Sequence, residues 1–156
     1  MARDGPPNFV PLPGPDGVEG RIQLESEEMP WALSHVPGPP PGLIHKVLRL
    51  VEETGEMTVL ACSVPHYDYP QLEFHDCVEE IYCVEGEIWL GNAGTMKAGS
   101  YLWRPPFITH GPFYSGPGSV IIVWTPSTLV NHYVDDPSST PEENRLQARQ
   151  EAGAAA

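Results

Sequence analysis

Residues 70–87, PQLEFHDCVEEIYCVEGE, decide the fold of this chain. Side chains alternate between the two faces of a β-strand, so Glu73 and His75 project to the same side. Glu79 shares that parity and reaches the same point where the chain stays extended. A buried carboxylate without a partner is costly, and two carboxylates that converge with a histidine indicate a bound cation. The pattern therefore predicts a cation site in the mouth of a β-barrel.

Residues 98–113, AGSYLWRPPFITHGPF, supply a further donor. Gly99 begins a turn into a strand, and the Pro105-Pro106 pair ends that strand. His110 then opens the next strand, and neutral imidazole is a common metal ligand. The two stretches together offer four candidate donors to one metal ion.

The spacing of these residues resembles that of the cupin family. The first cupin motif has His-x-His, three or four residues, Glu, six residues and Gly, and the second has Gly, five residues, Pro and then x-Gly-x-x-His. The matching positions of the first motif are Glu73, His75, Glu79 and Gly86, and those of the second are Gly99, Pro105 and His110. The resemblance covers residues 73–110 and implies that one divalent metal ion is bound by Glu73, His75, Glu79 and His110.

Two positions depart from the motifs. Glu73 replaces a histidine, and Phe107 replaces the glycine of the second motif, which we interpret as a loop variation. Two histidines with two glutamates form a harder, more anionic ligand set, which favours Fe(II), Mn(II) or Zn(II) over Cu(I). Of these we expect Fe(II). Glu73 has an alternative role as a general base that faces the cavity beside a set of two histidines and one carboxylate.

The rest of the chain predicts an all-β domain. It holds 19 prolines and 15 glycines in 156 residues, which favours short strands and turns over long helices. Apolar segments of strand length lie between turn signals, and no window has a sustained helical stripe. The predicted strands are Trp31–Val36, Leu43–Val51, Met57–Val64, Leu72–Asp76, Glu80–Glu85, Glu87–Gly91, Ser100–Arg104, Thr109–Phe113 and Ser119–Thr125. With the family resemblance, they imply a cupin double-stranded β-helix, or jelly-roll barrel.

The two ends differ from this middle part in composition. Residues 1–20 are rich in proline and glycine and predict a flexible, extended arm before a cupin domain at 21–136. Residues 137–156 predict a loose polar tail, although Pro141 and the acidic residues after it suit the first turn of a short helix.

Charge and cysteine content exclude several classes of function. A net charge of −13 leaves no basic surface for nucleic acid. No stretch approaches the roughly 20 apolar residues that span a bilayer, and no signal peptide is recognisable, so we expect a cytoplasmic protein without membrane contact. The odd set of three cysteines without Cys-x-x-Cys spacing predicts buried thiols rather than disulfides or a zinc-thiolate site.

Three kinds of function fit these observations. The chain is similar in size to cupin dioxygenases that cleave β-diketones, and this resemblance implies a small oxygenated organic substrate and a homodimer. A second possibility is a lyase, isomerase or cyclase in which Glu73 moves a proton with a raised pKa. A third is a cupin that binds a ligand without turnover. Arg104 is a candidate catalytic residue that pairs with a substrate oxygen, and its alternative partner is a surface acid.

Overall fold

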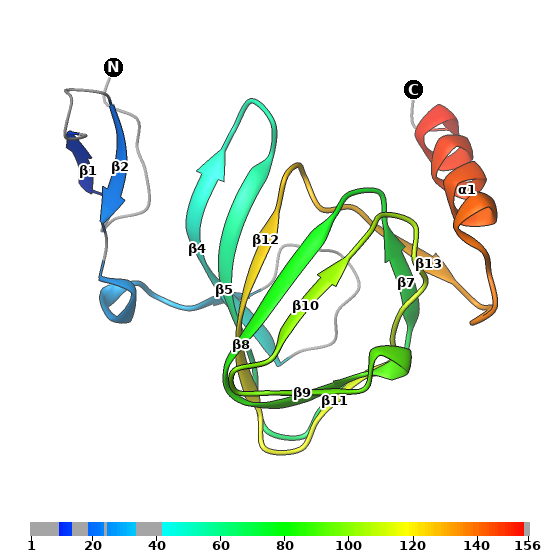
Figure 1. The fold of residues 1–156 in the computed structure, drawn as a ribbon, viewed down its shortest axis with the longest axis horizontal. Helices are drawn as coiled ribbons and strands as arrows, with labels where there is room; N and C mark the ends of the chain where they lie inside the picture. The colour runs from blue at the N-terminus through cyan, green and yellow to red at the C-terminus, as the bar shows by residue number, and fades with distance from the viewer. Residues whose placement is uncertain (1–9, 14–18, 24, 34–41, 155–156) are drawn as a thin grey trace.

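The computed structural model describes residues 10–13, 19–23, 25–33 and 42–154, with side-chain burial from residue 25 onward. The described elements are strands, two short 3₁₀ turns and one helix (Figure 1). In chain order they are β1 (Val10–Pro13), β2 (Glu19–Gln23), η1 (Ser26–Glu28), β3 (Ala32–Leu33), β4 (Leu43–Val51), β5 (Glu56–Ser63), β6 (Tyr67–Tyr69), β7 (Leu72–His75), β8 (Glu79–Leu90), η2 (Gly91–Ala93), β9 (Thr95–Lys97), β10 (Tyr101–Arg104), β11 (Phe113–Ser115), β12 (Ser119–Thr125), β13 (Asn131–Val134) and α1 (Pro141–Ala154).

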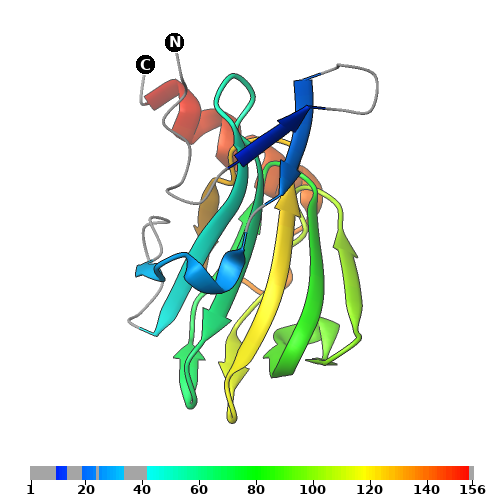
Figure 2. The same ribbon diagram turned by 90° about the vertical axis from the view of Figure 1, so that its left-hand side faces the viewer.

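One curled antiparallel sheet forms the barrel. Its strands follow the order β3-β4-β5-β12-β8-β11-β6, and β9 and β10 also pair with β8. The first half of β8 lies between β10 and β12, and its second half lies between β9 and β11. Figure 2 shows β4, β5, β12, β8 and β10 side by side. The strands β7 and β13 form a separate antiparallel pair. The all-β barrel predicted from the sequence is confirmed.

The long strand β8 corrects one prediction. Glu80–Glu85 and Glu87–Gly91 were expected as two strands, but they form one strand that bends at Gly86. Gly86 has φ of +72°, and a Cβ there would lie 2.1 Å from the carbonyl oxygen of Gly118. Only glycine fits such a backbone at so close an approach. The motif glycine therefore lets one strand serve both halves of the barrel.

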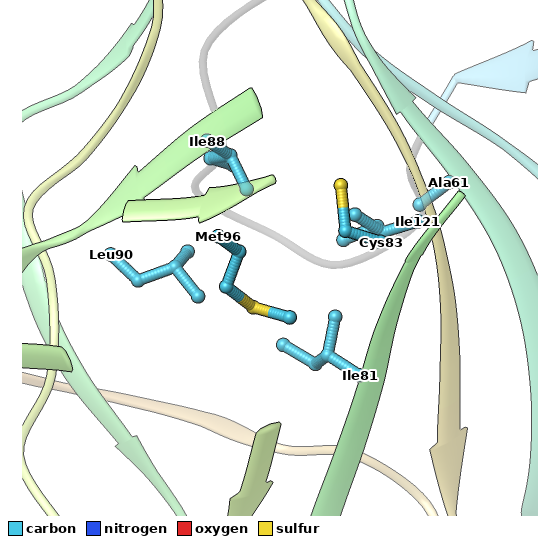
Figure 3. Packing of buried hydrophobic residues seen from close by; sticks show 7 residues of the cluster. All are labelled: Ala61, Ile81, Cys83, Ile88, Leu90, Met96 and Ile121. Carbon is cyan, nitrogen blue, oxygen red and sulfur yellow. The ribbon is translucent and has the colours of Figure 1, made fainter. Parts of the chain in front are cut away.

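The core lies between the two halves of the curled sheet. Its buried members come mainly from β8 and from strands paired with it (Figure 3). They are Ala61, Ile81, Cys83, Ile88, Leu90, Met96 and Ile121. All three cysteines are free thiols; Cys77 and Cys83 are buried, as predicted, whereas Cys62 is only half-buried.

The predicted loose tail is wrong for residues 141–154, which form helix α1 beside β13 and β7 (Figure 1). Its start is a capping box: the Thr140 N–H donates to the Glu143 carboxylate at 2.8 Å, and the Glu143 N–H donates back to the Thr140 hydroxyl at 3.4 Å. Proline at the first helical position adds to this signal. No helix within the described residues has the length and apolarity needed to cross a bilayer.

The predicted boundaries near the ends of the chain can be compared with the structure only in part. Residues 10–13 and 19–23 form the antiparallel pair β1–β2, which crosses the predicted boundary between the arm and the domain at residue 20, whereas 1–9 and 14–18 lie outside the described residues. The predicted strand Trp31–Val36 contains β3, and its last three residues also lie outside that part of the chain.

Candidate metal centre

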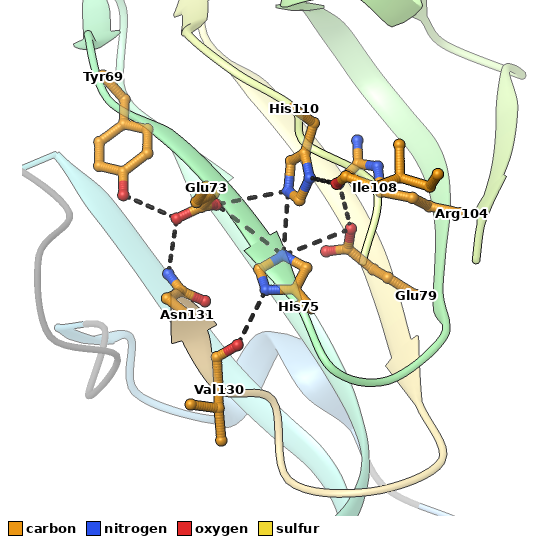
Figure 4. A network of polar contacts seen from close by, with 9 residues as sticks. All are labelled: Tyr69, Glu73, His75, Glu79, Arg104, Ile108, His110, Val130 and Asn131. Carbon is orange, nitrogen blue, oxygen red and sulfur yellow. Dashed lines mark hydrogen bonds and ion pairs between the residues drawn. The ribbon is translucent and has the colours of Figure 1, made fainter. Parts of the chain in front are cut away.

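Three of the four predicted ligands meet inside the barrel. Glu73 and His75 lie on β7 and point to the same side, as the alternation of strand side chains predicts (Figure 4). His110 reaches them through a backbone bridge: the Glu73 N–H donates to the His110 carbonyl at 2.9 Å, and the reverse bond measures 2.8 Å. The predicted strand Thr109–Phe113 is therefore wrong in extent, because β11 begins only at Phe113.

The distances among these three side chains suit a single small cation. The Nε2 atoms of His75 and His110 are 3.1 Å apart, and Glu73 Oε1 lies 3.6 Å from His110 Nε2 and 3.9 Å from His75 Nε2. All three residues are at most 5% exposed. Two metal–nitrogen bonds of about 2.1 Å at a right angle place the nitrogens about 3 Å apart. The two histidines therefore have the spacing of neighbouring ligands.

Hydrogen bonds on the far sides of the two rings fix their tautomers. His110 Nδ1 lies 2.8 Å from the Ile108 carbonyl, and His75 Nδ1 lies 3.3 Å from the Val130 carbonyl. A carbonyl only accepts, so each Nδ1 carries a proton, and Nε2 is the nitrogen that each ring offers to a metal ion. Burial lowers the pKa of His75, although the nearby carboxylates act to raise it. Two Nε2 atoms and a carboxylate oxygen that converge on one point fit a metal ion.

Glu73 is held as an ionised carboxylate. Its Oε2 accepts hydrogen bonds from the Tyr69 hydroxyl at 2.8 Å and the Asn131 amide at 2.9 Å, which leaves Oε1 directed at the histidines. Burial acts to raise the pKa of Glu73, but the interactions with His110, His75 and Tyr69 outweigh it, and the pKa lies below its usual value. The raised pKa expected for a general base is wrong. Sequence reasoning missed Tyr69, which is four residues before Glu73, and Asn131, which only the fold brings near it.

Glu79 lies next to these three residues, but its carboxylate is paired with the guanidinium of Arg104. Its Oε2 is 3.9 Å from His75 Nε2 and accepts a hydrogen bond from Arg104 Nη1 at 2.6 Å. It lies outside the group of three whose donor atoms are within 4.8 Å of one another. Metal ligation by Glu79 stays a prediction. Arg104 is only 7% exposed, so its acid partner is a buried one and not the surface acid that was considered.

Helix α1 holds the loop that leads to His110. The Asn144 amide nitrogen, in a fully buried side chain, donates to the Phe107 carbonyl and the Thr109 hydroxyl, both at 2.8 Å. The Phe107 N–H in turn donates to the His75 carbonyl at 2.7 Å. The helix is thereby connected to two of the three candidate ligands. The sequence signals for this helix, Pro141 and the acidic residues after it, did not indicate this role.

A cavity of about 260 Å³ opens beside the three ligands. Its wall is mostly apolar, and the ligands, Arg104 and Asn131 form a polar patch on it. The volume lies just below the usual range for ligand sites, about 300–1,000 Å³. The arrangement suits a small organic molecule in contact with a metal ion.

Comparison with known proteins identifies the family. Residues 19–127 match the model of the ChrR cupin-like domain. The chain belongs to this cupin family. No curated protein matches this cupin significantly in sequence. Among solved structures it is similar to the polyketide cyclase RemF from Streptomyces resistomycificus, with TM-score 0.61, 22% identity and coverage of 80% of this chain and 96% of that one.

Two further structures are similar to this cupin. A proposed acetylacetone dioxygenase from Methylibium petroleiphilum has TM-score 0.61 and 16% identity, with 78% of this chain and 88% of that one covered. A proposed dioxygenase from Nostoc punctiforme has TM-score 0.59 and 19% identity, with 70% of this chain but only 39% of that one covered. At such identities the similarity shows the fold alone.

Proposed function

We propose that this cupin is an Fe(II)-dependent dioxygenase that acts on a small oxygenated organic substrate. The observation that carries the proposal is the convergence of Glu73 Oε1 with two Nε2 atoms, those of His75 and His110, at the wall of an apolar cavity. Two histidines and one carboxylate with open positions are the ligand set typical of non-haem iron oxygenases.

The residues of the chain would divide the work between them. Glu73, His75 and His110 would hold the ion, and Tyr69 and Asn131 would orient Glu73 from behind. Fe(II) bound there would allow the substrate, which supplies the electrons, to react with dioxygen. The apolar wall would exclude water and hold the hydrocarbon part of the substrate in place.

Acetylacetone is the first substrate to test, because a structural neighbour carries that proposed activity. The balanced reaction of a β-diketone with one O₂ breaks one carbon–carbon bond and gives a carboxylic acid and an α-ketoaldehyde, with one oxygen atom of O₂ in each. Dioxygen is thus the oxidant, and no other reductant or oxidant is required.

The test uses the full chain, freed of metal and reloaded anaerobically with Fe(II) or Zn(II). We expect oxygen uptake with acetylacetone and related diketones for the iron form only, and none for His110→Ala, with His66→Ala as a control on an exposed histidine. Failure of the chain to bind one Fe(II) or Zn(II) would overturn the proposal. Turnover by the zinc form without oxygen would instead identify a lyase, isomerase or cyclase, and stoichiometric ligand binding without turnover would identify a binding protein.

A further inference from the structure

The charged side chains on the cavity wall determine which net charge a ligand should have. The charged side chains among the described residues that line the cavity are Glu73, Glu79 and Arg104. Two carboxylates and one guanidinium leave one uncompensated negative charge. A divalent ion at the candidate metal centre turns this into one uncompensated positive charge. A charge in a mostly apolar cavity is costly unless it is paired, so a ligand with one negative charge is favoured.

Arg104 has a donor left over for such a ligand. Its Nη1 donates to Glu79, but its Nη2 is buried and has no hydrogen-bond partner among the described residues. A buried N–H without an acceptor costs free energy that a ligand oxygen would recover. The planar guanidinium is suited to bind one anion on each side of its fork. Arg104 itself lines the cavity, and Glu79, to which it donates, lies 3.9 Å from His75 Nε2.

Most of the remaining wall is aliphatic and disfavours a polar ligand body. The aliphatic side chains come from the neighbouring strands β4, β5, β12 and β8, and they include Val47, Val59, Ile81, Ile121 and Val123. Hydroxyl groups of a sugar or the second charge of a dianion would lie against these side chains without partners.

We propose that Arg104 forms an anion subsite, and that the cavity takes a small organic monoanion whose carboxylate or enolate oxygen accepts a hydrogen bond from Arg104. The hydrocarbon part of this ligand packs on the aliphatic wall. The inference rests on the proposed function, because the metal ion supplies the uncompensated positive charge.

Benzoate and benzamide form the probe pair, since they share shape but differ in charge. Calorimetric titration uses the zinc-loaded chain, so that no oxygen reaction interferes. We expect benzoate to bind about tenfold more tightly than benzamide, which is the difference between a charge-assisted and a neutral hydrogen bond. The preference is lost in Arg104→Gln and kept in Arg49→Gln, where a surface arginine loses its own glutamate partner, Glu56.

A double variant distinguishes loss of the subsite from misfolding of the protein. Arg104→Gln leaves Glu79 buried without its cation, so Glu79→Gln/Arg104→Gln, which replaces the pair by two amides, is measured beside it, with circular dichroism and zinc content for each protein. Absence of zinc binding by the wild type overturns the proposed function. Stoichiometric zinc without Arg104-dependent binding of either benzoate or acetylacetone, or a benzoate preference that survives in both variants, overturns the subsite alone.

Acetylacetone distinguishes the two sources of the ligand oxygen. Binding of benzoate only identifies carboxylates, and Arg104-dependent binding of acetylacetone with a weak response to benzoate identifies enolates. Either result supports the subsite. If neither probe depends on Arg104, the proposal is wrong.

Discussion

Removal of the Asn144 side chain, which lies on helix α1 and not in the metal centre, should weaken metal binding. Asn144→Ala deletes two buried hydrogen bonds, to the Phe107 carbonyl and the Thr109 hydroxyl. At about 1 kcal/mol each they contribute about 2 kcal/mol. The higher helix propensity of alanine returns about 0.5 kcal/mol. The expected net loss of about 1.5 kcal/mol lowers Tm by roughly 3–6 °C for a chain of this length.

The effect on the metal should exceed this loss of stability. Phe107 binds the His75 backbone and Thr109 precedes His110, so a loosened loop misplaces two ligands at once. Loss of such outer contacts typically costs 10–100-fold in metal affinity. Competition with a chromophoric chelator measures the affinity, and calorimetry measures Tm. Gln147→Ala, which removes an amide of the same helix that donates to the Tyr133 carbonyl, is the control. The reasoning is refuted if Asn144→Ala lowers Tm but binds metal as tightly as the control does.

Three further outcomes test the centre itself. Tyr69→Phe removes one donor to Glu73 Oε2 and should weaken zinc affinity about tenfold, measured by the same chelator competition. His75→Ala should abolish stoichiometric zinc binding in elemental analysis, whereas the exposed His66→Ala should keep it. Folding lowers the pKa of Glu73, so its carboxylate stabilises the metal-free protein above about pH 4.3. This stabilisation is lost as the pH falls through the lower pKa of the folded state. In Glu73→Gln the free energy of unfolding, measured between about pH 3 and 6, should therefore depend less on pH.

The sequence predicted those strands best that have their own turn signals. β4 and β12 have the predicted bounds, since each is an apolar run between glycine or proline turns. The short strands β6, β9 and β13 were missed. Each spans only three or four residues and is defined by its partner, as β13 is by β7. Such pairing depends on contacts between distant parts of the chain, which a local pattern does not contain.

The candidate site was predicted to the level of residue type and strand parity. Alternation placed Glu73 and His75 together, and the spacing of the second motif brought in His110. The same parity rule placed Glu79 beside them but did not reveal that Arg104 binds it. Arg104 lies on β10, which pairs with the first residues of β8, so this contact follows from strand register. A single sequence does not give that register.

The departure of Phe107 from the cupin motif is explained by the helix that was expected to be a loose tail. Phe107 has φ of +68°, the left-handed region that favours the motif glycine and costs another residue about 1–2 kcal/mol. Three contacts offset this cost: its N–H binds the His75 carbonyl, its carbonyl accepts from Asn144, and its ring lies 5.0 Å from the guanidinium of Arg145. Two of the three come from α1. The loop that leads to His110 can therefore hold a side chain at position 107 because helix α1 packs on that loop. The loop and the helix form one unit.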